Sequence, residues 1–145
     1  MGSPTTTPAR RRSVEDMSIA VELEELRAQI EQFGTAYVLT VSDDGRAHSV
    51  AVSVGWRGDE LVVPAGRTTS RNATARPLVA LLWPPTTADG YSLIVDAMFV
   101  AGVEIPGGHE LTLHPTKAVL HRPAPSGVGS DCKPVLASER SGERI

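Results

Sequence analysis

The stretch Gly66-Arg67-Thr68-Thr69-Ser70-Arg71-Asn72 is the point around which the expected fold is organised. An apolar, strand-like run ends at Gly66, three hydroxyl residues follow between two arginines, and a short helix is expected over residues 72–76. A helix start exposes unpaired N–H groups and the positive end of a dipole. Arginine adds a charge and a planar fork that match phosphate. The pattern predicts an anion-binding turn, with an ordinary Ser/Thr-capped surface helix as the alternative.

A helix and then strands are expected before this turn. A capping-box pattern begins at Ser13, and apolar residues then recur at spacings of three and four, which predicts one amphipathic helix ending at Gly34. Its apolar face consists of Ile19, Leu23, Leu26, Ile30 and Phe33. We expect this helix to cover one end of the core, with partner binding as the alternative.

The first two strands form a predicted hairpin over residues 35–42 and 46–54, joined at Asp43-Asp44-Gly45. The two faces of the return strand differ in size. Its large face carries Val50, Val52 and Val54, and its small face carries Ala47, Ser49, Ala51 and Ser53. A face of small residues allows a helix, a ligand ring or a second subunit to approach the sheet closely.

Four more strands complete the expected set. A turn at Arg57-Gly58-Asp59 leads into residues 60–65, and an apolar strand over residues 78–83 is predicted to be buried on both faces. The last two strands are predicted over residues 91–105, with a kink at Gly102, and residues 109–122, where Pro115 requires a bulge or an edge. Six strands without a repeat predict a mainly β fold, a closed or partly closed antiparallel barrel.

The 145 residues fit one domain. We expect it at residues 13–122, between a disordered leader at residues 1–12 and a mobile tail at residues 123–145. A net charge of -3 and 4% aromatic residues argue against nucleic-acid binding. No apolar run is long enough for a membrane span. The single cysteine, Cys132, has no partner for an internal disulfide, which suits a cytoplasmic protein.

The histidines do not predict a metal site. They are His48, His109, His114 and His121, and none has a second histidine or a cysteine at ligand spacing. Tetrahedral zinc requires three or four ligands that converge. No metal is therefore expected.

Two ordered motifs resemble a known family. The first is Asp44-Gly45-Arg46-Ala47-His48 between two strands, and the second is Ser70-Arg71-Asn72 followed by the strand Leu78-Val79-Ala80-Leu81-Leu82-Trp83. In this order they resemble the pyridoxamine 5′-phosphate oxidase-like family of flavin-binding split β-barrels, over about residues 20–122. The resemblance implies a six-stranded antiparallel split β-barrel with an N-terminal helix and a short helix after the third strand. It also implies a homodimer with flavin sites at the subunit interface.

The resemblance implies where FMN would bind. The phosphate would be held by residues of the turn after the third strand, namely Arg67, Thr68, Ser70 and Arg71. The ring would lie along the second and third strands and beside the end of the fourth, at His48, Ser49, Val50, Ala51, Pro64, Ala65 and Trp83.

Departures from the family pattern limit the expected reaction. Pyridoxamine phosphate oxidases have a lysine where this chain has Asn72, are longer, and carry C-terminal substrate residues that are not found here. We therefore expect an FMN-dependent oxidoreductase that transfers hydride to or from an unidentified small molecule, without vitamin B6 oxidation. The alternatives are a reductase that uses the deazaflavin coenzyme F-420, whose binders often have lysines in this turn, and a non-catalytic flavin- or haem-binding dimer.

Overall fold

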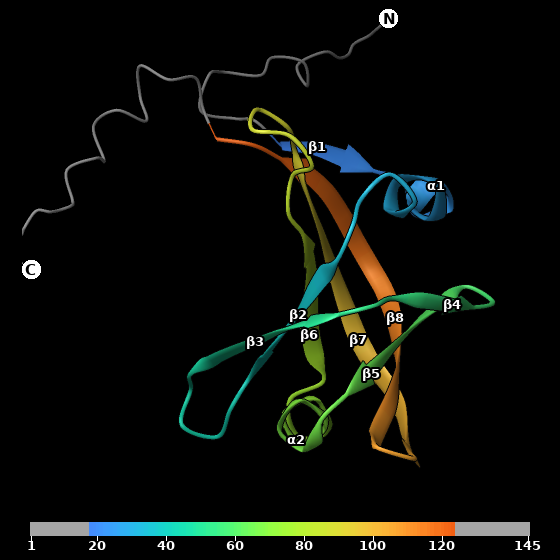
Figure 1. Cartoon of the computed structure of the whole chain (residues 1–145), viewed down its shortest axis with the longest axis vertical. Coiled ribbons are helices and arrows are strands. Elements are labelled where there is room, and N and C mark those ends of the chain that lie inside the picture. Colours follow the sequence, from blue (N-terminus) through green and yellow to red (C-terminus); the bar gives the residue numbers. More distant parts are fainter. Residues whose placement is uncertain (1–17, 124–145) are drawn as a thin grey trace, which may run out of the picture. The chain divides into compact units, whose positions relative to one another are not determined.

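Eight strands and two short α-helices follow one another along residues 18–123, the part of the chain that the computed structural model describes (Figure 1). Residues 19–121 belong to one unit. The elements are β1 (Ser18–Val21), the 3-10 turn η2 (Leu23–Glu25), α1 (Leu26–Ile30), β2 (Ala36–Val41), β3 (Ala47–Val52), β4 (Gly55–Arg57), β5 (Glu60–Ala65), α2 (Arg67–Ala75), β6 (Leu78–Trp83), β7 (Ser92–Ile105) and β8 (Gly108–His121).

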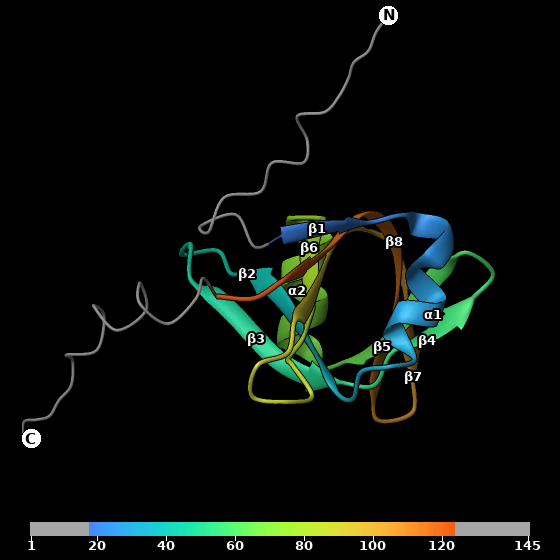
Figure 2. The ribbon, with the colours of Figure 1, turned by 90° about the horizontal axis from the view of Figure 1, so that it is seen from above.

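The strands form one antiparallel sheet in the order β3-β2-β6-β7-β8-β5-β4, with β1 paired to β8. All six predicted strands are present, within one or two residues at each end. Two further strands, β1 and β4, were not predicted. The sheet curves round its core (Figure 2) but is not closed by pairing between its ends, so the partly closed form of the predicted barrel is the one found.

The predicted N-terminal helix is present but much shorter than expected. Residues 18–21 form β1, and the helical segment covers only η2 and α1. The reason lies in β8, because β5 pairs with it only from His109 to Leu113 and leaves the rest of that edge available to another strand. Pairing of β1 with β8 satisfies the backbone groups of both strands. A longer helix would satisfy only its own backbone groups and would leave this edge of β8 unpaired. The capping box at Ser13 lies outside the described residues.

The core consists of the inward-facing residues of the curved sheet together with Leu26 and Ile30 from the helical segment. The strand β6 contradicts one expectation, since burial alternates along it. Val79, Leu81 and Trp83 are buried, whereas Leu78 is 71% exposed. An antiparallel strand with one covered face produces this pattern, although every residue in it is apolar.

The helix α2 begins at Arg67, five residues earlier than predicted. Gly66 occupies the cap position in extended conformation, and no side chain caps the helix, so the predicted Ser/Thr cap is wrong. The amide of Asn72 is buried and donates from Nδ2 to Oγ1 of Thr40 on β2, at 3.1 Å. This bond fixes α2 against the sheet and explains why Asn72 points into the protein.

The β2–β3 turn forms at Asp43-Asp44-Gly45 as predicted, with Gly45 at a positive φ of 84°. The Asp44 carboxylate accepts hydrogen bonds from the Ser42 hydroxyl and the Arg46 backbone N–H. These bonds, the first more than the second, hold the pKa of Asp44 below its ordinary value.

The strands β7 and β8 form a long hairpin with two irregularities. Thr116 has no opposite residue, because Asp96 pairs with Lys117 and Ala97 with Pro115, which confirms the bulge predicted at Pro115. A second shift lies at Val100, two residues before the predicted kink at Gly102. On its other edge β7 pairs with β6 only from Leu93 to Met98, so the segment after Met98 has no strand partner there among the described residues.

Within residues 18–123 no helix is long and apolar enough to cross a membrane. The predicted leader, nearly all of the predicted tail and Cys132 lie outside the described residues.

The Asn72–Thr40 bond can be tested by substitution. We expect Asn72→Ala to lower the free energy of unfolding by about 2 kcal/mol, because the buried Thr40 hydroxyl loses its partner. The measurement is urea unfolding. Thr74→Ala is the control, since exposed Thr74 only donates to the Ser70 carbonyl of its own helix, and its effect should stay within about 0.5 kcal/mol. Equal losses in the two variants would contradict the proposed role of the bond.

Candidate functional site

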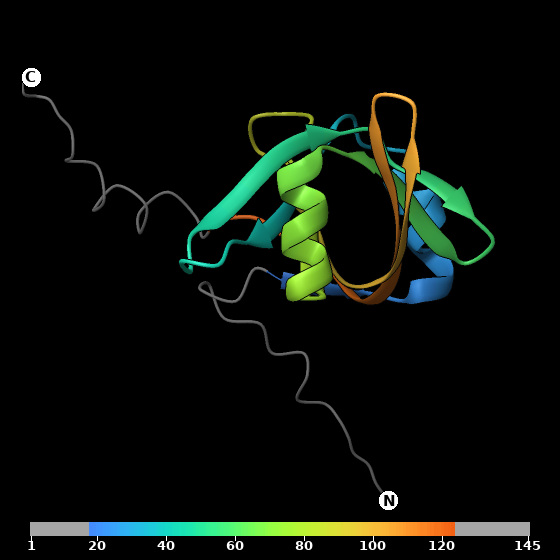
Figure 3. The same cartoon turned by 90° about the horizontal axis from the view of Figure 1, so that it is seen from below.

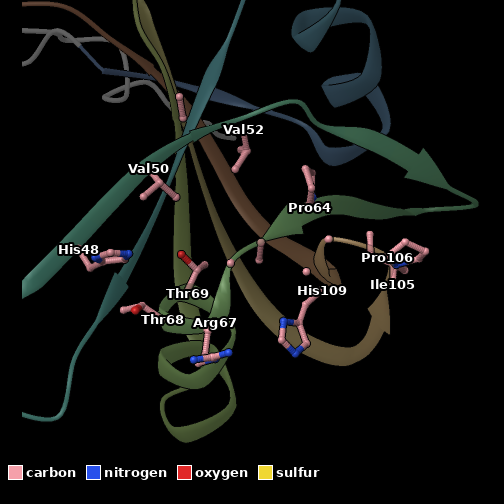
Figure 4. Close-up of a pocket in the computed structure, with 15 residues that line it drawn as sticks. His48, Val50, Val52, Pro64, Arg67, Thr68, Thr69, Ile105, Pro106 and His109 are labelled. Atoms are coloured by element: carbon pink, nitrogen blue, oxygen red, sulfur yellow. The ribbon is translucent and has the colours of Figure 1, made fainter.

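A cavity of about 550 Å³ lies between β3, the junction of β5 with α2, and the turn between β7 and β8. It occupies the region where the two ends of the sheet are not paired. The helix α2 lies between β3 and the β7–β8 hairpin (Figure 3), and its first residues are among the side chains that line the cavity (Figure 4). Its lining residues are His48, Val50, Ala51, Val52, Pro64, Ala65, Gly66, Arg67, Thr68, Thr69, Ile105, Pro106, Gly107, Gly108 and His109.

The cavity brings together most of the predicted site residues from two distant segments. From β3 and β5 come His48, Val50, Ala51, Pro64 and Ala65, and from the first turn of α2 come Arg67 and Thr68. The predicted alternation between the two faces of β3 explains why Val50 and Val52 line the cavity. Val50 and Val52 are the more buried residues of this strand, whereas Ala47, Ser49 and Ala51 are exposed.

Four predicted residues do not line the cavity. Ser49 is exposed on the small face of β3, and Trp83 is only 1% exposed inside the core. Ser70 and Arg71 follow the lining part of α2, because this segment is a helix and not the predicted turn. Arg71 is exposed and lies one helical turn beyond Arg67, away from the cavity, and the Ser70 backbone is engaged within α2.

The charge at the cavity is positive. The described ion pairs of arginine join Arg46 to Asp44, Arg57 to Glu110 and Arg76 to Asp43, and none involves Arg67. The first turn of α2 contains no acidic residue, and no carboxylate is among the lining residues. The guanidinium of Arg67 and the N–H groups at the start of α2 therefore face the cavity without a competing anion from its walls.

The β7–β8 turn is the part of the site that sequence reasoning missed. Gly107 and Gly108 have positive φ values of 89° and 157°. A Cβ atom at Gly108 would lie 2.9 Å from the Ala65 carbonyl oxygen, so the turn rests closely on the end of β5. The sequence signal for this turn is the Pro106-Gly107-Gly108 run between the last two predicted strands.

His109 follows this turn and lines the cavity. Its Cα is paired with that of Ala65, which precedes the cap of α2. Its Nδ1 atom is buried and has no hydrogen-bond partner among the described residues. No group of three His, Cys, Asp or Glu side chains within residues 18–123 is arranged to hold a metal ion.

Comparison with known proteins identifies sequence relatives of this chain. No protein-family model matches it. An uncharacterised protein of Mycobacterium bovis and one of Mycobacterium tuberculosis are each 37% identical to it over 116 residues, which make up 72% of this chain and 82% of each relative. The chain belongs to one family with these two proteins.

Several solved structures are similar to this chain and share its fold. An FMN-binding protein of Syntrophomonas wolfei has a TM-score of 0.56 at 15% identity, with 66% of this chain and 83% of that chain covered. A putative pyridoxamine 5′-phosphate oxidase of Listeria innocua has a TM-score of 0.55 at 14% identity, covering 68% and 96%. An F420 reductase has a TM-score of 0.51 at 20% identity, covering 58% and 87%. The fold is the split barrel of pyridoxamine 5′-phosphate oxidase-like proteins, which confirms the predicted resemblance.

The close contact at Gly108 predicts a difference between two neighbouring glycines. Gly107→Ala introduces strain from positive φ but no contact within 4 Å, and we expect a loss of about 1 kcal/mol in the free energy of unfolding. Gly108→Ala adds the contact with the Ala65 carbonyl and should cost at least about 1 kcal/mol more. Urea unfolding of both variants measures the difference. Equal losses would mean that the turn does not rest on β5.

Proposed function

We propose that the protein is a flavin-dependent oxidoreductase that binds FMN in this cavity. The observation that carries the proposal is the convergence, in one cavity, of apolar strand residues with Arg67 and the start of α2. Clefts of about 300–1,000 Å³ with apolar walls and a few directed polar groups are typical of cofactor sites. The cavity volume of about 550 Å³ lies within this range.

The residues present fit the two ends of FMN. Arg67, the Thr68 hydroxyl and the free N–H groups of the first turn of α2 would hold the phosphate. Val50 and Pro64 offer apolar walls for the ring, and His48 is a candidate hydrogen-bond donor beside them. When bound, the flavin supplies hydride transfer at its ring. The chain's own residues bind it, orient it and limit its access to water.

The comparisons support this assignment at the level of the fold. One structure with this fold is that of an FMN-binding protein, and another is that of an F420 reductase. The second likeness favours the main alternative, a reductase that uses the deazaflavin F-420 in the same cavity. A dimer that binds flavin without turnover is a further alternative, and it differs in that no electron donor would reduce the bound flavin.

We further propose that the protein acts as a homodimer, which associates through the outer face of β2, β6 and β7. The strand registers place one row of residues from each strand on this face. They are Tyr37, Leu39 and Val41 of β2, Leu78, Ala80 and Leu82 of β6, and Ile94, Asp96 and Met98 of β7. Four of these large apolar side chains are clearly exposed, and Leu78 is 71% exposed. An exposed face that is apolar apart from one residue, here Asp96, is typical of an interface between subunits.

Substitution of Leu78 tests the dimer. We expect Leu78→Asp to convert the protein to a monomer, because a buried, unpaired carboxylate at the interface is strongly unfavourable. The measurement is analytical ultracentrifugation. Leu23→Asp is the matched control, since Leu23 is 42% exposed in η2, outside the proposed interface, and this variant should remain a dimer. A monomeric wild-type protein, or a dimeric Leu78→Asp variant, would refute the proposed interface.

The cofactor is tested by the visible absorption spectrum of the purified protein, alone and after gel filtration with FMN or F-420. We expect retained FMN bands that NAD(P)H or another reduced donor bleaches. We also expect Arg67→Ala to weaken FMN binding by about 1.5–3 kcal/mol, the range for a charge-assisted contact. Arg71→Ala should weaken it less, because Arg71 does not line the cavity, and Arg46→Ala in the β2–β3 turn is the control.

Each other result has a definite meaning. Retention of F-420 alone would establish the deazaflavin alternative, and FMN that no donor reduces would favour the non-catalytic dimer. A protein that retains neither cofactor would refute the proposed function.

A further inference from the structure

The β7–β8 turn forms one wall of the cavity beside the start of α2. Gly108 rests on the Ala65 carbonyl, and Ala65 is followed directly by Gly66, the cap residue of α2. The same turn contributes Ile105, Pro106 and Gly107 to the cavity wall. A ligand group bound at the start of α2 therefore lies against the β7–β8 turn on one side. A ligand with a longer tail could not extend past the turn in that direction.

The ring of His109 lines this end of the cavity and has one nitrogen without a partner among the described residues. A neutral imidazole carries one N–H donor and one acceptor nitrogen. Nδ1 is buried without a partner among the described residues, and a buried unpaired N–H is more costly than an unpaired acceptor. The neutral ring therefore carries its proton on Nε2. Because the residue is only half-buried and lines the cavity, this N–H is the group available to a ligand.

The donors around the start of α2 come from two separate elements. Arg67 and the first N–H groups belong to the helix itself, and His109 comes from β8 (Figure 4). Donors on different sides suit a ligand group with several acceptor oxygens in different directions. A phosphate monoester has three such oxygens, whereas a diester has two, because a second ester bond occupies the remaining position.

We infer that the cavity selects a terminal phosphate monoester over a phosphodiester, and that Nε2–H of His109 donates to one of the three phosphate oxygens. This inference rests on the proposed function, since it concerns the phosphate end of the same site. It selects FMN, whose phosphate is terminal, over F-420, whose phosphate is a diester with a chain beyond it. His109 is thus a specificity-determining residue that no sequence motif indicated.

The test compares FMN with riboflavin, which lacks the phosphate, in the full-length protein. We expect His109→Ala to weaken FMN binding at least about tenfold, which corresponds to the loss of a hydrogen bond to a charged group, and to change riboflavin binding less than twofold. His109→Gln should restore part of the FMN affinity, because its amide N–H can take the place of Nε2–H. His114→Ala is the control, since His114 lies elsewhere on β8 and pairs with Glu60. Its affinity for FMN should match that of the wild type.

The outcomes separate this inference from the proposed function. Unchanged FMN affinity in His109→Ala would overturn the inference while flavin binding stands, and so would a wild-type protein that binds F-420 as tightly as FMN. If the wild type binds no flavin, the proposed function fails, and inorganic phosphate becomes the probe. A phosphate-dependent shift of the His109 ring signals in NMR spectra would then support the phosphate site, and the absence of a shift would overturn it.

Discussion

The buried hydrogen bond from Asn72 to Thr40 is the constraint on which the arrangement of the cavity depends. It joins the middle of α2 to the inner face of β2 and so fixes both the depth and the rotation of the helix. With Asn72 turned inward, the first-turn residues Arg67 and Thr68 lie at the cavity, and Arg71 lies one turn further along the helix, outside it. A lysine in place of Asn72 could not be accommodated in this buried position without an unpaired charge. The position of Asn72 therefore fixes how α2 lies against the sheet.

The incomplete closure of the sheet provides the space that this helix borders. In a fully paired barrel the interior is filled with side chains, and the core around Leu81, Val95 and Leu113 is packed in that way. Between β3 and β5 the pairing stops, and polar and apolar groups from four segments meet around a cavity. The barrel thus combines a packed half, which supplies stability, with an open half, which can accommodate a binding site.

The sequence predicted those parts of the fold that depend on local pattern. The period-two strands, the Asp43-Asp44-Gly45 turn and the bulge at Pro115 follow from alternation, glycine and proline, which act within a few residues. The failures involve long-range pairing. Residues 18–21 have a helical pattern but pair with an edge of β8 that lies about a hundred residues away in sequence. The apolar strand β6 gave no sign that one of its faces is exposed.

The same distinction applies to the site. Arg67, Thr68 and the β3 and β5 residues are close to one turn in sequence, so a motif could indicate them. His109 reaches the cavity only because β8 pairs with β5, and the register of that pairing cannot be read from local residues. Trp83 is the opposite case, because its position at the end of a strand suggested a site, whereas it is buried in the core and does not line the cavity.

The irregular hairpin of β7 and β8 also bears on aggregation. Within residues 18–123, the segment of β7 beyond Met98 has no strand partner on one edge, and it exposes Val100 and Val103. These are features of a strand that recruits other chains. The register shift at Val100 interrupts the regular spacing of its backbone donors and acceptors, and exposed Glu104 adds a charge near its end. Natural sheets use bulges and charges in this way to prevent uncontrolled strand addition. The register shift and the charge of Glu104 thus make this edge of the long hairpin a poorer template for the addition of another strand.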